Sequence, residues 1–181
     1  MPWQAGGETL TAGSVTPGQD KTVTLLFTND VESAYDPIPA FWRDDMSMIG
    51  GIAQMTTLIR DLRRQEPNVF LFDSGDIFTG ALAKLTEGRL AFELMITMGY
   101  DAMAIGNHEF EYGHEVFEWQ KNRVPFPVLG ANFFYRDTDH PYAQAHAIIE
   151  RNGIRIGVIA VSYTHLTLPT NRVAGSDRVW A

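Results

Sequence analysis

Apolar and polar positions along the chain predict strands that alternate with helices. Four short runs are almost entirely apolar and have the length of strands buried on both faces: 23–27, 69–72, 102–105 and 126–129. Three segments between them repeat apolar residues at helical spacing: 50–64, 87–99 and 114–123. This order predicts an α/β fold, a layered α/β sandwich built around a parallel sheet.

The pattern changes near both ends of the chain. Two strand-like runs, 145–150 and 154–161, flank Asn152-Gly153, which is the strongest short signal for a β-hairpin. Residues 1–21 are polar and rich in Gly and Thr, and we expect a disordered lead-in there. Residues 162–181 continue neither period, and our hypothesis is that this tail is foreign sequence, such as a translated adaptor. The folded domain is therefore expected over 22–161.

Side chains with metal-binding or proton-transfer chemistry follow directly after the first three strands. The segments are Thr-Asn-Asp-Val-Glu at 28–32, Asp-Ser-Gly-Asp at 73–76 and Gly-Asn-His-Glu-Phe-Glu at 106–111. Ligands bind at the carboxyl ends of parallel strands, so we expect one crevice to gather these side chains. The candidates are Asp30, Glu32, Asp73, Asp76, Asn107, His108 and Glu111. Their oxygen donors and one imidazole suit divalent cations such as Mn²⁺, Fe²⁺ or Zn²⁺.

Composition narrows the class of ligand. The chain has 181 residues, 45% of them hydrophobic, which is enough for one core. A net charge of −8 argues against binding a nucleic-acid strand, but a small phosphate ester stays compatible because bound cations reverse the local field. With no cysteine, neither disulfides nor thiolate metal sites can form. No run reaches the length of about 18 apolar residues that a membrane span needs, and no signal peptide is visible.

The three motifs together resemble the calcineurin-like metallophosphoesterases over about residues 23–161. Within them, the chain is most similar to the 5′-nucleotidase/2′,3′-cyclic-nucleotide phosphodiesterase branch, which includes UDP-sugar hydrolases. The resemblance implies hydrolysis of a phosphate ester, expected to be a nucleotide, with two divalent metal ions (Mn, Zn, Fe or Mg) that clamp the attacking and leaving oxygens. Relatives of this branch are usually exported, so an exported or periplasmic location is expected.

The resemblance also implies a role for each matching residue. It identifies four metal ligands: Asp30, Glu32, Asp76 and Asn107. Asp76 corresponds to the carboxylate that bridges the two metals, and the alternative is a helix N-cap. Glu32 stands where the family has a histidine; it either ligates and shifts the preference toward Mn²⁺ or Mg²⁺, or points to solvent.

His108 and Glu111 are the implied catalytic pair. His108 matches the histidine that protonates the leaving group, and the alternative is a polar residue satisfied in the core. Glu111 stands where the branch has Asp and would orient the imidazole through its other ring proton. Asp73 and Glu109 are expected to hold loop backbone rather than metal.

Two expectations concern side chains outside these motifs. Trp42 is interpreted as a packing anchor for its loop, with a wall of the substrate cleft as the alternative. Arg60, Arg63 and Arg64 lie off the apolar face of their helix and are expected to be solvated.

Later histidine motifs of the family, and its C-terminal domain that grips the nucleoside, have no counterpart in this sequence. The chain therefore resembles the N-terminal half of the catalytic domain, and we expect it to have little or no activity alone. Two alternatives remain open at this point: a non-catalytic metal- or nucleotide-binding module, and a sulfur-compound hydrolase of the same fold.

Overall fold

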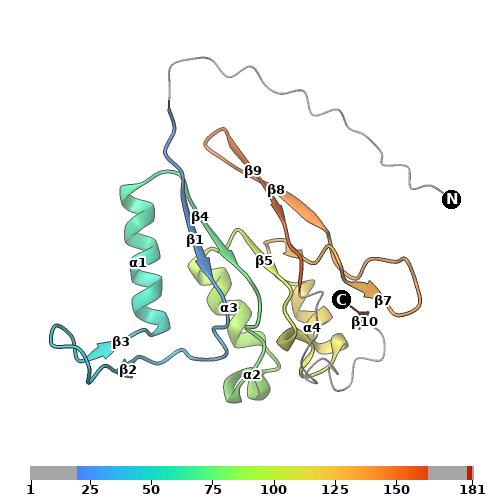
Figure 1. The fold of residues 1–181 in the computed structure, drawn as a ribbon, viewed down its shortest axis with the longest axis horizontal. Helices are drawn as coiled ribbons and strands as arrows, with labels where there is room; N and C mark the ends of the chain where they lie inside the picture. The colour runs from blue at the N-terminus through green and yellow to red at the C-terminus, as the bar shows by residue number, and fades with distance from the viewer. Residues whose placement is uncertain (1–19, 163–178, 181) are drawn as a thin grey trace.

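A four-stranded parallel sheet forms the centre of the molecule (Figure 1). The computed structural model describes residues 20–162 and 179–180. The sheet has the order β1-β4-β5-β6. Its strands are β1 (Thr24–Thr28), β4 (Val69–Asp73), β5 (Ala102–Ala104) and β6 (Val128–Leu129). All neighbours are parallel, as the β–α alternation predicts, so the carboxyl ends of the strands share one edge.

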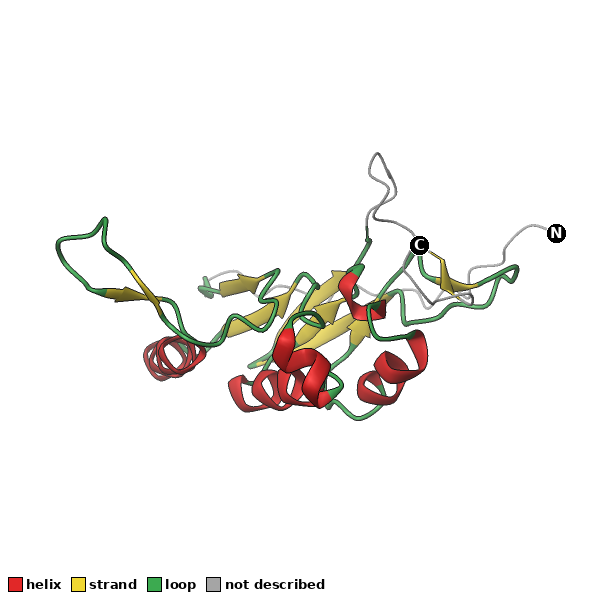
Figure 2. Ribbon diagram, turned by 90° about the horizontal axis from the view of Figure 1, so that it is seen from below, coloured by secondary structure: helices red, strands yellow, loops and turns green. Residues whose placement is uncertain are grey.

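Helices form one layer on one side of this sheet (Figure 2). They are α1 (Ile52–Gln65), α2 (Ala81–Thr86), α3 (Arg89–Met98) and α4 (His114–Lys121). The three predicted helices are confirmed, whereas α2 was not foreseen. Six residues are too few to reveal a helical period, and the break at Glu87 and Gly88 has positive φ values of 50° and 72°. A side chain at Gly88 would overlap the ring of Phe78, so this break requires glycine.

The predicted hairpin covers part of the other side of the sheet. It consists of β8 (His146–Arg151) and β9 (Ile154–Ile159), joined by Asn152-Gly153 with φ values of 52° and 71°. Two positive φ values are what the favoured two-residue turn requires, so the Asn-Gly prediction is confirmed. Inward-facing residues of the hairpin pack on β4, β5 and β6 in a cluster that includes Phe70, Phe72, Ala102, Leu129 and Ala147.

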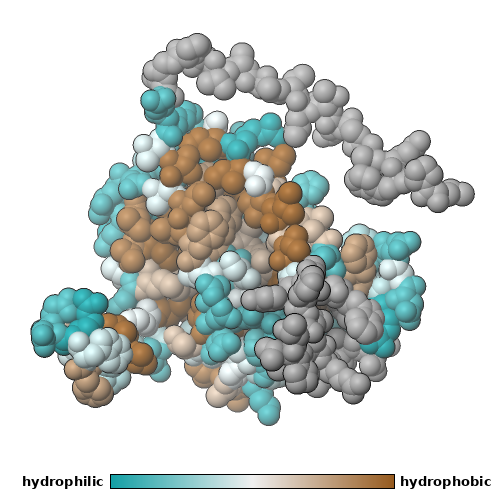
Figure 3. Space-filling view, viewed as in Figure 1, coloured by the Kyte–Doolittle hydropathy of each residue, from teal (hydrophilic) through white to brown (hydrophobic). Residues whose placement is uncertain are grey.

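The expectation that the first strand is buried on both faces is wrong. β1 is an edge strand, and the side chains of Leu25 and Phe27 are 46% and 64% exposed. Hydrophobic side chains are visible at the surface over this part of the molecule (Figure 3). Near-continuous apolar sequence predicted burial correctly for β4, which lies inside the sheet, but it did not reveal which strand lies at the edge.

Arg63 is not solvated, which corrects another expectation. Its guanidinium donates to the carbonyl oxygens of Met98 and Gly99 and lies 3.7 Å from Asp101. Arg60 and Arg64 remain largely exposed, as predicted. The helical period placed Arg63 off the apolar face, but the tertiary structure brings the end of α3 within its reach.

An arm formed by β2 (Ile38–Pro39) and β3 (Met48–Ile49) stands away from the body in both ribbon views (Figures 1 and 2). Trp42 lies in this arm and is 67% exposed, so its interpretation as a packing anchor is wrong. A short strand pair, β7 (Phe134–Tyr135) with β10 (Val179–Trp180), and the 3₁₀ helix η1 (His108–Phe110) complete the described elements. Most of the predicted lead-in and tail lies outside the described residues.

Candidate active site

Backbone hydrogen bonds tie the first and second strand-end loops together at the carboxyl edge of the sheet. The amide of Asp30 donates to the carbonyl of Gly75 at 3.1 Å, and the amide of Ser74 donates to the carbonyl of Thr28 at 2.8 Å. The third loop joins them, since the amide of His108 donates to Oδ1 of Asp76 at 2.9 Å. The predicted convergence of the three loops is therefore confirmed.

Several residues of these loops adopt left-handed backbone conformations. Asp30, Glu32 and Asp76 have φ values of 50°, 46° and 61°, a region that costs about 1–3 kcal/mol for a residue with a side chain. Gly75 has φ 103°, and a Cβ there would lie 2.6 Å from the amide nitrogen of Gly106. The second and third loops thus meet backbone to backbone, and only glycine permits this approach.

The buried side chain of Glu109 binds the backbone of both the second and the third loop. It is fully buried, and its carboxylate accepts hydrogen bonds from the amides of Gly106, Asp76 and Ile77 at 2.6, 3.1 and 2.9 Å. Burial raises the pKa of Glu109 to about 7, against the opposing effect of these three donors. The prediction that Glu109 binds loop backbone is confirmed.

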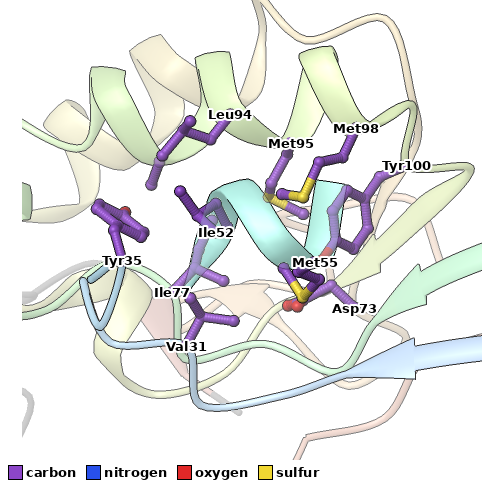
Figure 4. A pocket seen from close by; sticks show the side chains of 11 residues that line it. Val31, Tyr35, Ile52, Met55, Asp73, Ile77, Leu94, Met95, Met98 and Tyr100 are labelled. Carbon is purple, nitrogen blue, oxygen red and sulfur yellow. The ribbon is translucent and has the colours of Figure 1, made fainter. Parts of the chain in front are cut away.

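Asp73 has the same kind of role at the end of β4. Its carboxylate accepts hydrogen bonds from the amide of Gly75 at 2.8 Å and from the hydroxyl of Thr28, which also contacts the Tyr100 hydroxyl at 2.8 Å. Burial raises the pKa of Asp73 to about 6. Asp73 also borders a small cavity between the sheet and the helices, whose lining is mainly apolar and includes Met55 and Met95 (Figure 4). This cavity lies in the core, and Asp73 faces it. The other candidate site residues lie nearer to solvent than Asp73 does.

His108 lies between two carboxylates. Its Nδ1 is 2.9 Å from Oε2 of Glu111, and its Nε2 is 3.8 Å from Oε1 of Glu32. Burial alone would lower the pKa of His108, but the hydrogen bond to Glu111 and the charges of Asp76, Glu111 and Glu32 raise it. The imidazole is therefore biased toward its protonated form while its side chain stays 36% exposed.

The four predicted metal ligands lie on the three loops but do not form a complete cage. Asp30, Glu32 and Asn107 are exposed and Asp76 is half-buried. Oδ2 of Asp30 accepts a hydrogen bond from its neighbour Asn29, and Oδ1 of Asp76 is engaged with His108. Within residues 20–162, no three Asp, Glu, His or Cys side chains are arranged to hold a metal ion. The donor types fit divalent cations, but the described residues supply only part of a ligand set.

Sequence reasoning missed the residues that surround Glu111. Burial alone would raise the pKa of Glu111, but the neighbouring side chains of Thr79, His108 and Tyr112 lower it. Neither Thr79 nor Tyr112 belongs to a recognisable metal or proton-transfer pattern. Their position directly beside the motifs, Thr79 shortly after Asp76 and Tyr112 next to Glu111, was the only available signal.

Comparison with known proteins identifies the family. Residues 23–170 match the model of the calcineurin-like phosphoesterase family, and the chain belongs to this family. It is 34% identical to the protein UshA of Yersinia enterocolitica, over 80% of this chain and 26% of the relative. It is 35% identical to the 5′-nucleotidase of Vibrio cholerae, over 79% of this chain and 26% of that protein.

Solved structures agree with the family and the fold. The crystal structure of a 5′-nucleotidase precursor from Thermus thermophilus matches with a TM-score of 0.69 and 27% identity, covering 77% of this chain and 28% of the other. The family resemblance and the metallophosphoesterase fold are thereby confirmed. The chain spans about a quarter of the length of these relatives. No helix in the described part of the chain is long and apolar enough to cross a membrane.

Proposed function

We propose that this chain carries part of a metal-dependent phosphoester hydrolase of the 5′-nucleotidase type, with a nucleotide as substrate. The observation that carries the proposal is the imidazole of His108, held on its Nδ1 side by Glu111 and partly exposed beside Asp76. Family membership supports the reaction class, and the nucleotidase relatives support the substrate class.

Two divalent cations are the proposed cofactors. Asp30, Asp76 and Asn107 would hold them, with Asp76 as the shared carboxylate. Glu32 would be a fourth donor only after turning away from His108, which lies 3.8 Å away. Cations bound at such an edge stabilise the charge that develops on a phosphoryl group and its leaving oxygen.

His108 is the proposed general acid. Glu111 would accept the Nδ1 proton, so the other proton of the imidazolium is on Nε2, which lies 3.8 Å from Oε1 of Glu32. Donation of that proton neutralises the alkoxide that departs from phosphorus. The raised pKa of His108 supports this role because it favours the protonated form of the donor.

The partial ligand set predicts weak metal binding and slow turnover by the 181-residue chain alone. We propose that the remaining ligands, and the domain that binds the nucleoside, belong to the part of the longer relatives that has no counterpart here. The alternative is a non-catalytic metal- or nucleotide-binding module, which is supported by Glu32 standing where the family has a histidine.

Hydrolysis of p-nitrophenyl phosphate in excess Mn²⁺ distinguishes the hydrolase from the non-catalytic binding module. We expect slow hydrolysis that Mn²⁺ stimulates, and that Asp76→Asn and His108→Ala bring to the blank rate. Glu115→Gln is the matched control, since Glu115 is exposed and lies outside the three loops. Hydrolysis that is absent, or equal in all variants, would support the binding module; rapid turnover would contradict the incomplete ligand set.

A further inference from the structure

The first strand-end loop contains a tight turn built from residues that disfavour it. The amide of Ala34 donates to the carbonyl of Val31 at 2.7 Å, and Glu32 and Ser33 between them have φ values of 46° and 60°. Positive φ at both central residues is typical of type I′ turns, in which Gly, Asn and Asp predominate. The hairpin turn at Asn152-Gly153 uses the favoured residues, whereas the Glu32-Ser33 turn does not.

The Glu32-Ser33 turn is only partly fixed by the core. Val31 and Tyr35, on either side of it, point into the cavity between the sheet and the helices (Figure 4). They fix where the chain enters and leaves the turn. A left-handed backbone at residues with side chains persists only where the surroundings enforce it, and such strain is concentrated at functional sites. Contacts of the two central residues themselves must therefore hold the conformation between these anchors.

The hydroxyl of Ser33 binds the start of α2. It donates to the carbonyl of Thr79 at 2.6 Å and accepts a hydrogen bond from the amide of Ala83 at 3.2 Å. The first amides of a helix have no partner within the helix, and a side chain at the N-cap commonly accepts from one of them. The N-cap of α2 is Gly80, which has no side chain. Ser33 therefore supplies the cap from another loop, and its hydroxyl joins the turn to the helix.

Gly80 allows the turn and α2 to meet closely. It has φ 90°, and a Cβ there would lie 3.0 Å from both the carbonyl oxygen of Glu32 and the Cβ of Ser33. The third loop contacts the same position, since the hydroxyl of Tyr112 donates to the carbonyl of Gly80 at 3.1 Å. The start of α2 is thus bound to the first loop by Ser33 and to the third loop by Tyr112.

The turn determines where the carboxylate of Glu32 lies. Oε1 of Glu32 is 3.8 Å from Nε2 of His108. The Glu32 side chain is 47% exposed, so its direction depends on its backbone more than on packing. A negative φ at Glu32 would turn its Cα–Cβ bond to another side of the loop and remove the carboxylate from the imidazole.

We propose that Ser33 is a positioning residue: its hydroxyl holds the Glu32-Ser33 turn in its left-handed form and thereby keeps the Glu32 carboxylate at the proposed metal-binding edge, beside His108. Ser33 acts through Glu32 and touches neither metal nor substrate. The inference rests on the proposed function, because the place of Glu32 matters only where cations bind at this edge. The turn itself can be examined without metal or substrate.

Nuclear Overhauser spectra of the full chain in EDTA test the turn directly. A positive φ brings the amide and α protons of a residue close together, so Glu32 and Ser33 of the wild-type chain should each show a strong contact between these protons. Ser33→Ala removes the hydroxyl but keeps the strain, and the contact at Glu32 should weaken. Ser33→Gly removes both, and since glycine adopts positive φ readily, the contact at Glu32 should stay strong.

Mn²⁺ affinity, measured by electron paramagnetic resonance, tests the consequence for the site. Loss of a residue that orients a ligand weakens metal binding, and we expect a loss of about tenfold in Ser33→Ala, as in Glu32→Gln. The double variant should bind no more weakly than Glu32→Gln, because Ser33 acts through Glu32. Ser33→Gly should restore most of the affinity. Ser47→Ala is the matched control, since Ser47 is exposed in the arm and lies outside the three loops.

Wild-type proton contacts in Ser33→Ala would overturn the proposal. So would additive losses of Mn²⁺ affinity in the double variant, or a Glu32→Gln chain that binds Mn²⁺ as tightly as wild type. A Ser33→Gly chain as impaired as Ser33→Ala would contradict a role through the turn.

Two provisions keep the test decisive. Where Ser33→Ala does not fold, Ser33→Cys takes its place, because a thiol is a weaker donor than a hydroxyl, and smaller losses in the same direction are expected. The expected changes in proton contacts and Mn²⁺ affinity, in a chain that never hydrolyses phosphate esters, would keep this inference and remove the proposed function.

Discussion

Oδ1 of Asp76 accepts a hydrogen bond from the backbone amide of His108 at 2.9 Å. This contact joins the proposed bridging carboxylate to the loop that carries the proposed proton donor. One side chain therefore sets the distance between the two chemical functions. The backbone of Asp76 is left-handed, with φ 61°, and its carboxylate meets the first residue of the short 3₁₀ helix His108–Phe110 in the third loop.

Glu109→Gln should loosen both loops. The amide has one acceptor oxygen where the carboxylate offers two, and its NH₂ group would face the donors of Gly106, Asp76 and Ile77. Leaving buried donors unsatisfied costs about 1–3 kcal/mol, and we expect a loss in that range from the free energy of unfolding. Urea denaturation measures it. A Glu109→Gln chain as stable as wild type would show that the loops do not depend on this carboxylate.

Asp101 should be the most important ionic side chain for stability. Its carboxylate accepts from Arg151 at 2.6 Å and from the amide of Leu71 at 2.9 Å, and Arg63 lies 3.7 Å away. Asp101→Ala would leave two partly buried guanidinium groups without their shared partner. Breaking such a pair costs about 3–5 kcal/mol, and we expect about 3 kcal/mol by urea denaturation.

The exposed pair of Arg43 and Asp45 provides the control for Asp101. It has a short contact of 2.6 Å but lies in the arm, largely in solvent. Asp45→Ala should leave the unfolding midpoint unchanged because surface ion pairs are weak. Equal losses in both variants would mean that the Asp101 cluster is no more than a surface pair.

Sequence patterns predicted the parallel sheet, the helices α1, α3 and α4, and the Asn-Gly hairpin. Each of these depends on local periodicity or on a local turn. The exposure of Phe27 and the engagement of Arg63 could not be predicted in that way. They depend on which strand lies at the edge and on which helix end lies nearby, and neither has a local signature.

Asp73→Asn should remove a pH dependence of stability. Burial raises the pKa of Asp73 from 3.8 to about 6, so the folded chain binds this proton more tightly than the unfolded chain. The corresponding stabilisation is complete below about pH 4 and is lost as the pH rises through about 6. Relative to Asp73→Asn, wild type should therefore lose about 1–3 kcal/mol of unfolding free energy over this window.

Urea denaturation at several pH values measures that difference. Comparison with Asp73→Asn cancels the contributions of all other carboxyl groups. A difference that stays constant between about pH 4 and 7, or that grows in favour of wild type, would contradict a raised pKa at Asp73.

Glu32→His should change the metal preference of the site. An imidazole beside Asp30 is a softer donor than a carboxylate and carries no negative charge, which favours Zn²⁺ over Mg²⁺ and Mn²⁺. We expect Zn²⁺ to bind about tenfold more tightly, a change of about 1.4 kcal/mol. Competition with a chromophoric chelator measures this affinity, and Glu115→His is the control. Unchanged affinity would mean that Glu32 does not face the metal position.

The residues of the candidate site illustrate what a motif can and cannot reveal. Asp30, Asp76, Asn107 and His108 were found because each follows a strand in a recognisable order. Thr79 and Tyr112 carry no such signal, since a hydroxyl near a carboxylate is visible only once the loops are folded together. Whether Asp30, Glu32, Asp76 and Asn107 bind metal stays a prediction.

Mn²⁺ titration of the chain, followed by paramagnetic broadening of its assigned amide signals, tests the central claim most directly. That claim is that three strand-end loops hold divalent cations together. Signals of residues 28–32, 74–77 and 106–108 should broaden together at the lowest Mn²⁺ additions, and Asp76→Asn should abolish the effect. Broadening that begins instead at the exposed residues Asp44, Asp45, Asp137 and Asp139, or that persists unchanged in Asp76→Asn, would contradict it.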